Sequence, residues 1–188
     1  VRFIQTPLEI ASKMVAGVFE PLNTVVCTSA TLQIGNNFSY WMNRSGVNFV
    51  DKERIIIGDY PSPFEYTKNT QLLITSDSPN PSSYNFQSFL EDAIPKLINS
   101  SQGRSLILFT SYDSLKKAWE VAVSSSLCKG ITILKQGDED RFKLLEHFKK
   151  DTQSVLFATD SFWEGVDVPG ESLSHVIIVK LPFRVPSD

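Results

Sequence analysis

The feature that most constrains the fold is a series of short apolar runs that alternate with helical patterns. The clearest runs are RSLILF, GITIL, SVLFA and HVIIV, which begin at residues 104, 130, 154 and 175. A strand with one wet face alternates apolar and polar residues, whereas a run that is apolar throughout is typical of a strand buried on both faces. Such strands belong to parallel sheets covered by crossover helices. The pattern therefore predicts a three-layer α/β fold with a mostly parallel sheet.

The first part of the chain adds weaker signals of the same kind. Residues 24–30 (TVVCTSA), 54–58 (RIIIG) and 71–75 (QLLIT) are rich in β-branched or apolar side chains, and each predicts a short strand. Between the first two, residues 36–46 (NNFSYWMNRSG) predict a short helix that ends at Gly46.

Three later segments carry apolar residues on one helical face. The stripes are Phe86, Phe89, Leu90, Ala93, Ile94, Leu97 and Ile98, then Leu115, Ala118, Trp119 and Ala122, then Phe142, Leu145 and Phe148. Pro95 interrupts the first segment and should kink it. Each helix is expected to cover the sheet.

Composition excludes several classes of protein. The net charge is −3, so the chain as a whole has no positive potential that would attract nucleic acid. A nucleic-acid-binding protein of this charge would need a local positive patch, or hydrogen bonds from backbone amides or hydroxyls. Cys27 and Cys128 lack metal-ligand spacing, which favours two small buried residues over a disulfide and predicts no metal site. No apolar run approaches the ~20 residues of a membrane span. A cytoplasmic protein is expected, and Val1 is expected to lie inside a longer chain.

Polar residues follow four of the predicted strands. They are Thr28-Ser29-Ala30-Thr31, Thr110-Ser111-Tyr112, Gln136-Gly137-Asp138 and Thr159-Asp160. In an open parallel sheet, ligands collect beyond the carboxyl ends of the strands, so these groups should converge on one edge. Ser111 also precedes a helix, where it could cap the helix, contact a phosphate, or both. Asp138 is placed to begin the helix at 139–150.

The loop after SVLFA carries more charge than a turn between two core strands needs. It holds Glu164 and Asp167, with Gly165 and Gly170 to let the backbone turn tightly and approach a ligand. A carboxylate held there could accept a hydrogen bond from a ribose hydroxyl or pair with an arginine. The neighbouring residues Phe162 and Trp163 could stack on a base or pack under their own loop.

Several nucleotide and catalytic motifs are missing. The sequence has no G-x-x-x-x-G-K-[ST] phosphate loop, no G-x-G-x-x-G, no G-x-S-x-G and no zinc spacing. A self-sufficient ATPase is therefore not expected, although half of a nucleotide site remains compatible with these residues.

The blocks VVCTSATL, SPFEY, LILFTSYDSL, QGDEDR and FATDSFWEGVDVPG, with VIIVKLPF after them, occur in this order along nearly the whole chain. In order and spacing they resemble the second, RecA-like motor domain of the DinG/XPD group of superfamily-two DNA helicases. The resemblance implies a RecA-like domain without a phosphate loop, and a role in ATP binding and single-stranded DNA translocation, in DNA repair or replication.

The resemblance also implies roles for individual residues. Ser29 and Thr31 would couple nucleotide state to DNA grip. Single-stranded DNA would be contacted by Thr110, Ser111, Tyr112, Gln136 and Thr159, and the ATP site by Glu164, Gly165 and Asp167, with Asp167 on the ribose. ATP with Mg²⁺ would be bound mainly by the first motor domain, the partner of this one. Many relatives carry an iron–sulfur cluster upstream.

In this resemblance, residues 1–35 would be the tail of the first motor domain and would carry motif III, the family block to which Ser29 and Thr31 correspond. Residues 36–188 would be the second motor domain, truncated before motif VI, the family block that supplies an arginine to the ATP site. The fragment alone is not expected to hydrolyse ATP. Two alternatives remain at this stage: a non-motor module that binds nucleic acid or a partner, and a helicase-like exonuclease.

Overall fold

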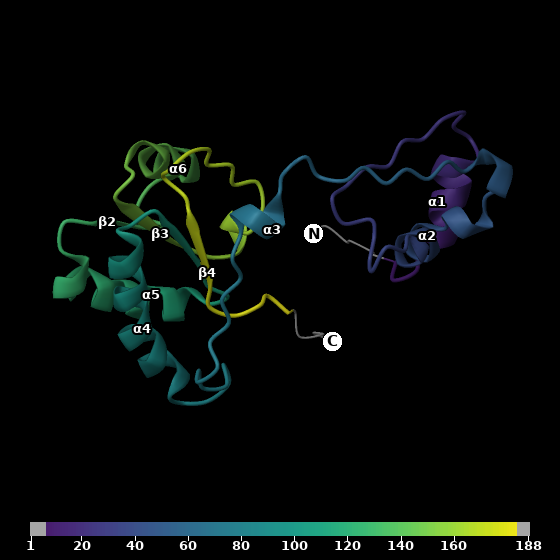
Figure 1. The fold of residues 1–188 in the computed structure, drawn as a ribbon. Helices are drawn as coiled ribbons and strands as arrows, with labels where there is room; N and C mark the ends of the chain where they lie inside the picture. The colour runs from purple at the N-terminus through teal and green to yellow at the C-terminus, as the bar shows by residue number, and fades with distance from the viewer. Residues whose placement is uncertain (1–6, 184–188) are drawn as a thin grey trace. The chain divides into compact units, whose positions relative to one another are not determined.

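The computed structural model describes residues 7–183. By its internal contacts the chain divides into two compact units, Val1–Gln71 and Leu72–Asp188, each of which is described by itself. Figure 1 draws the first in purple to blue and the second in teal to yellow. The assignment of residues 1–35 to a preceding motor domain stays a prediction.

The second unit is built on a four-stranded sheet. Its strands are β1 (Ser105–Leu108), β2 (Thr132–Lys135), β3 (Ser154–Ala158) and β4 (His175–Ile178), in the order β2-β3-β1-β4. All three neighbouring pairs are parallel. The apolar runs therefore predicted both the strands and their parallel pairing correctly, each to within two residues at either end.

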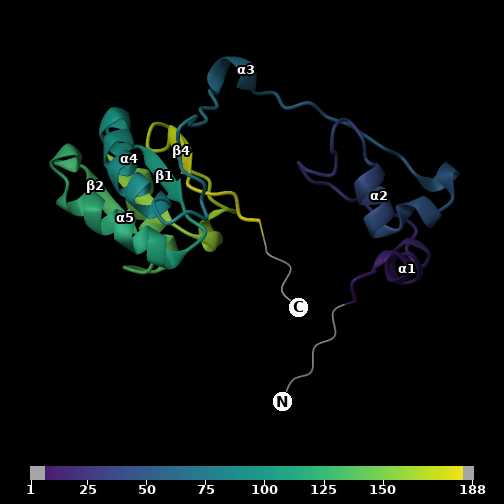
Figure 2. The same cartoon turned by 90° about the horizontal axis from the view of Figure 1, so that it is seen from below.

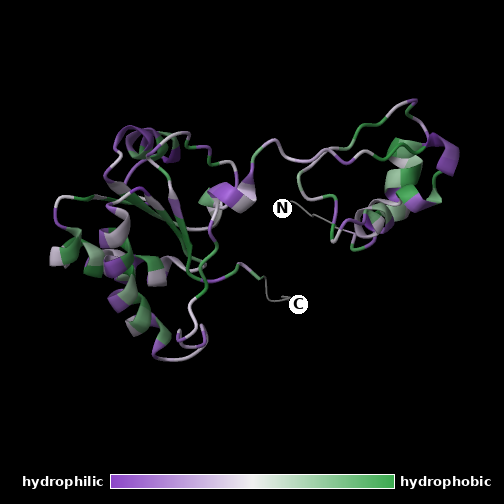
Figure 3. Cartoon of the chain, in the orientation of Figure 1, coloured by the Kyte–Doolittle hydropathy of each residue, from purple (hydrophilic) through white to green (hydrophobic). Residues whose placement is uncertain are grey.

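Helices cover both faces of this sheet (Figures 1 and 2). The helices α4 (Phe86–Ser101) and α5 (Tyr112–Ser124) pack on one face, against a core that includes Ile107 and Phe157. The helix α6 (Arg141–Lys150) packs on the other, where Leu106 and Leu156 point. Successive strand residues point to opposite faces, and the two central strands, β1 and β3, are buried at every position. The edge strand β4 departs from the prediction of burial on both faces, because Val176 is 55% and Ile178 48% exposed. Figure 3 shows the strands largely in hydrophobic colours and the helices in both.

The predicted helical stripes are right at most positions and wrong at two. In α4, Leu90, Ile94 and Ile98 are buried, but Leu97, at the margin of the stripe, is 44% exposed. In α6 the buried side chains are Leu144, Leu145 and Phe148, whereas Phe142 is 73% exposed. Phe142 precedes Leu144 by two residues, which turns it about 200° around the helix axis and away from the sheet.

In residues 7–71 the first unit forms only short helices. They are α1 (Ala11–Met14), a π-helical turn (Val15–Phe19), α2 (Ser39–Ser45), two 3₁₀ turns (Val47–Phe49 and Lys52–Arg54) and α3 (Tyr66–Asn69). As predicted, Gly46 ends α2, in a left-handed conformation with φ of +85°.

The strands predicted at residues 24–30, 54–58 and 71–75 are not formed, and this part of the prediction is wrong. All their side chains except that of half-buried Ile55 are exposed, with Val26 at 82%, Ile56 at 97% and Ile74 at 83%. A strand exists only by pairing with a neighbour, and within residues 7–183 none of these segments has a ladder partner. Apolar character alone cannot supply one.

Two smaller expectations concern cysteine and membranes. Both thiols are free, as expected, but only Cys128 is buried, because Cys27 lies in the exposed 24–30 segment. Burial raises the pKa of the Cys128 thiol. Among the described residues, no helix combines the length and apolarity that crossing a bilayer requires.

Candidate functional site

Three of the predicted polar groups meet at one edge of the sheet. The strands β1, β3 and β2 are adjacent and parallel, with Leu108 opposite Ala158 and Lys135 opposite Phe157. Their carboxyl ends therefore lie side by side. The residues that follow, Tyr112, Gln136, Thr159 and Ser161, form a hydrogen-bonded group that we name the strand-end cluster.

Gln136 is the centre of this cluster. Its side-chain Oε1 accepts hydrogen bonds from the backbone N–H of Thr159 at 2.6 Å and from the Thr159 hydroxyl at 3.0 Å. Its Nε2 donates to the Ser161 hydroxyl at 3.1 Å, and its backbone carbonyl accepts from the Tyr112 hydroxyl at 3.1 Å. One residue, through its side chain and its backbone carbonyl, thus joins the segments that follow three strands.

Gly137 makes the approach of Tyr112 feasible. Its φ is +100°, in the region that favours glycine, and a Cβ added there would lie 2.8 Å from the Tyr112 hydroxyl oxygen. Any other residue would push the tyrosine ring away from the Gln136 carbonyl. The glycine in the QGDEDR block is therefore explained by local packing.

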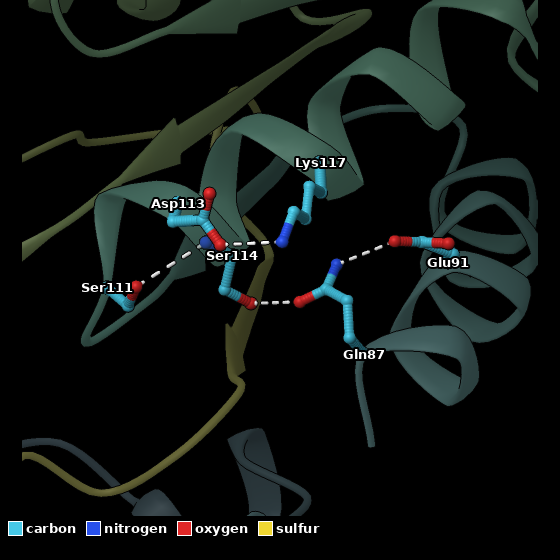
Figure 4. A network of polar contacts seen from close by, with 6 residues as sticks. All are labelled: Gln87, Glu91, Ser111, Asp113, Ser114 and Lys117. Carbon is cyan, nitrogen blue, oxygen red and sulfur yellow. Dashed lines mark hydrogen bonds and ion pairs between the residues drawn. The ribbon is translucent and has the colours of Figure 1, made fainter. Parts of the chain in front are cut away.

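A polar network anchors the start of α5 (Figure 4). Ser111 caps the helix, because its hydroxyl accepts from the Ser114 N–H at 3.4 Å. The Ser114 hydroxyl donates at 2.6 Å to Gln87 of α4. Asp113 and Lys117 pair at 2.8 Å, and hydrogen bonding to Asp113 raises the pKa of Lys117. Of the two readings of Ser111, capping is confirmed, and a contact with phosphate stays a prediction.

The start of α5 also presents groups to solvent. Thr110 is exposed, and the Tyr112 side chain is 49% exposed although its hydroxyl is bonded. Within the part of the chain that the structure describes, the Thr110 hydroxyl forms no hydrogen bond. It is therefore open to an acceptor from outside.

The loop after β3 begins with a 3₁₀ turn at Asp160–Phe162 and is anchored by two aromatic side chains. Phe162 is only 2% exposed, so it packs under its own loop and cannot stack on a base. Trp163 is half-buried, and its Nε1 donates to the Phe109 carbonyl at 3.4 Å. The two aromatics fix the position of the loop.

Arg141, the first residue of α6, also holds this loop, and the sequence did not indicate this role. Its Nη2 donates to the carbonyls of Glu164 at 3.2 Å and Gly165 at 3.4 Å. Its guanidinium carbon lies 5.2 Å from the centre of the Phe162 ring. The only signal was its position at the end of the QGDEDR block, and nothing in that block indicates a partner 23 residues away.

The carboxylates of the loop face solvent. Glu164 and Asp167 are both exposed, and Gly165 has φ of +67°. Among residues 7–183 neither carboxylate has an ion-pair or hydrogen-bond partner, so their lone pairs are available to the hydroxyl of a ligand. Their geometry fits the predicted nucleotide contact, whose occupancy stays a prediction.

Ser29 and Thr31 lie in the other unit and form a local turn. Their hydroxyl oxygens are 3.2 Å apart, and the Thr31 N–H donates to the Ser29 hydroxyl at 3.2 Å. Both are exposed. Their coupling role stays a prediction.

Asp138 does not begin α6, contrary to expectation. Asp140 caps that helix by accepting from the Phe142 N–H at 2.9 Å. Asp138 instead pairs with Lys135 at 3.0 Å, and this hydrogen bond raises the pKa of the lysine. No group of three or more His, Cys, Asp or Glu is arranged as metal ligands in the described residues.

Comparison with known proteins gives the family. A family profile described as "Helicase C-terminal domain" matches residues 94–188. The ATP-dependent DNA helicase YoaA of Haemophilus influenzae is 37% identical over 183 residues, 97% of this chain and 27% of that protein. The ATP-dependent helicase DinG of Mycobacterium tuberculosis strain H37Rv is 37% identical over 185 residues, with the same coverage of both chains.

A third relative is named for a different activity. The 3'-5' exonuclease DinG of Bacillus subtilis is 35% identical over 185 residues, 96% of this chain and 20% of that protein. The chain thus spans about a quarter of the length of these relatives. The profile match covers half of the chain, on the strands, helices and loop that form the site. The chain therefore belongs to the helicase C-terminal domain family and is a DinG-like member of the superfamily-two helicases.

Proposed function

We propose that this chain is the second motor lobe of an ATP-dependent DNA helicase, which grips single-stranded DNA and completes an ATP site formed mainly by a first motor domain. The observation that carries the proposal is the strand-end cluster, because it joins the predicted DNA-contact residues Tyr112, Gln136 and Thr159 into one bonded group. The names of two relatives, both ATP-dependent helicases, support it.

DNA would be held by neutral donors. The chain has a net charge of −3, so contacts with phosphate would come from hydroxyls and backbone N–H groups rather than from a basic surface. Thr110 and Thr159 each follow a strand at the same edge of the sheet, which suits two successive contacts with a DNA backbone. Ser111 and Tyr112 would add contacts at the start of α5.

The nucleotide would be met by the loop that begins at Thr159. The exposed carboxylate of Asp167 is an acceptor suited to a ribose hydroxyl, with Glu164 and Gly165 beside it in the chain. ATP with Mg²⁺, when bound, supplies the free energy of phosphate transfer to water. This chain has no phosphate loop, so its own residues would orient the nucleoside end only.

Both ligands would therefore be sensed by one segment. Thr159 and Asp167 are eight positions apart on a loop that Arg141, Trp163 and buried Phe162 hold in one shape. A displacement at the nucleotide end would then be passed to the DNA end. Ser29 and Thr31 would provide the coupling on the side of the first motor domain.

The alternative functions make different demands on these residues. A helicase-like exonuclease would need clustered acidic metal ligands elsewhere in the protein. Exonuclease is the activity in the name of the Bacillus relative. A non-motor binding module would need no nucleotide contact at Asp167. A cytoplasmic location and a role in repair or replication belong to the proposal as predictions.

The test is a pair of substitutions in the full-length gene product, studied by steady-state ATP hydrolysis. Thr159→Val removes one hydroxyl and should raise the DNA concentration needed for half-maximal stimulation while leaving the KM for ATP unchanged. Asp167→Asn should raise the KM for ATP and leave the DNA concentration needed for half-maximal stimulation unchanged. Equal effects of both variants on both constants would contradict the assignment, and Thr70→Val, in the other unit, serves as a matched control.

A further inference from the structure

Resting on the proposed function, we propose that Gln136 is a gate that occupies the phosphate-binding donors of Thr159 until DNA displaces it. This goes beyond the expectation that Gln136 is simply another DNA contact. The hydrogen bonds of the strand-end cluster carry the argument.

The chemistry fixes the direction of each bond. The backbone N–H of Thr159 can only donate, so the side-chain atom of Gln136 that it meets at 2.6 Å must be the amide oxygen. The same oxygen lies 3.0 Å from the Thr159 hydroxyl, and since an amide oxygen only accepts, the hydroxyl must donate its one proton to it. Both donors of Thr159 are therefore directed at a single acceptor atom.

Two convergent donors at the end of a strand are what a phosphate oxygen requires, because it also only accepts. The amide oxygen of Gln136 thus stands where a non-bridging oxygen of the DNA backbone would be received. Both acceptors cannot hold the same hydroxyl proton. Contact between Thr159 and phosphate must break at least one bond to Gln136.

The rest of Gln136 is fastened in this position. Its Nε2 donates to Ser161, its backbone N–H donates to Phe157 at 2.9 Å, and its carbonyl accepts from Tyr112. The backbone bonds hold the residue in place, whereas the side chain is retained by Thr159 and Ser161 alone among the residues described. The side chain can therefore leave while the backbone stays.

The experiment measures binding of a fluorescently labelled oligothymidylate to the full-length gene product, by anisotropy and without nucleotide. Gln136→Ala removes the competing acceptor and should tighten binding by about tenfold, the loss of one or two competing hydrogen bonds. Gln136→Glu keeps an acceptor, strengthens it with a charge and should weaken binding. The two substitutions are expected to act in opposite directions.

Two further variants isolate the gate. Ser161→Ala removes the acceptor of the Gln136 Nε2 and leaves Gln136 and Thr159 unsubstituted. It should tighten binding of the oligothymidylate by a few-fold. Thr159→Val removes the hydroxyl but keeps the backbone N–H that also donates to Gln136, so in this background Gln136→Ala should give a smaller gain than with Thr159 intact. A gain that is undiminished in this background would overturn the gate, as would weaker or unchanged binding by Gln136→Ala with Thr159 intact.

These outcomes separate the gate from the proposed function. A wild-type protein that binds no oligothymidylate would overturn the proposed DNA grip and the gate with it. A protein that binds through Thr159, shown by weaker binding of Thr159→Val, yet loses affinity in Gln136→Ala would retain the proposed function and overturn the gate alone. In that case Gln136 would be a DNA contact or a support for Thr159.

Discussion

Two phenylalanines on α6 allow a sharp test of how this helix packs. Phe148 is 0% exposed and belongs to the core that contains Leu106 and Leu156, whereas Phe142 is 73% exposed. Phe148→Ala should lower the free energy of unfolding by about 3–5 kcal/mol, the usual cost of emptying a buried aromatic site. Phe142→Ala should change it by less than about 0.5 kcal/mol. Alanine has a higher intrinsic helix propensity than phenylalanine, and because both substitutions lie in α6 this contribution cancels when the two variants are compared.

The assay is urea unfolding of the 188-residue chain, followed by tryptophan fluorescence. Trp119 and Trp163 both pack against the core of the second unit, so their signal reports on the relevant transition. The slopes of the transitions must agree before free energies are compared. Equal losses in the two variants would refute the packing described and would support the stripe of Phe142, Leu145 and Phe148 read from the sequence.

Three other outcomes are expected. Ser111→Ala, which removes the cap of α5, should cost about 1 kcal/mol in the same unfolding assay, and Ser111→Gly only a few tenths; equal costs would argue against capping. Cys27 should react with a thiol reagent at neutral pH well before Cys128, since Cys128 is buried and its pKa is raised; equal rates would contradict this burial. Arg141→Met should speed amide exchange at residues 163–166 of the full-length protein by losing the bonds to the 164 and 165 carbonyls; unchanged exchange would show that these bonds do not hold the loop.

The sequence predicted the second unit well because the apolar runs that mark its strands are local signals, and each run lies beside another strand in the fold. The run SVLFA became β3 over the residues quoted, and each of the four runs found a parallel neighbour. The runs at 24–30, 54–58 and 71–75 look similar in composition, but no neighbour meets them in the described residues. Pairing is a property of tertiary structure, so periodicity could not separate the two cases.

The site was predictable in its composition and not in its connections. Parallel strands bring their carboxyl ends to one edge, which is why Tyr112, Gln136 and Thr159 could be expected to converge. The sequence could not show that Gln136 directs its amide oxygen at both donors of Thr159, or that Arg141 reaches the 164 and 165 carbonyls. Those contacts depend on side-chain positions that no spacing rule records.

We have proposed that this chain is one lobe of a DNA-driven ATP motor. The most direct measurement is steady-state ATP hydrolysis by the full-length gene product, with and without single-stranded DNA, in the wild type and in Asp167→Asn at saturating DNA. We expect strong stimulation by DNA in the wild type, and a raised KM for ATP in the variant. Hydrolysis that DNA does not change, or no hydrolysis at all, would contradict the claim.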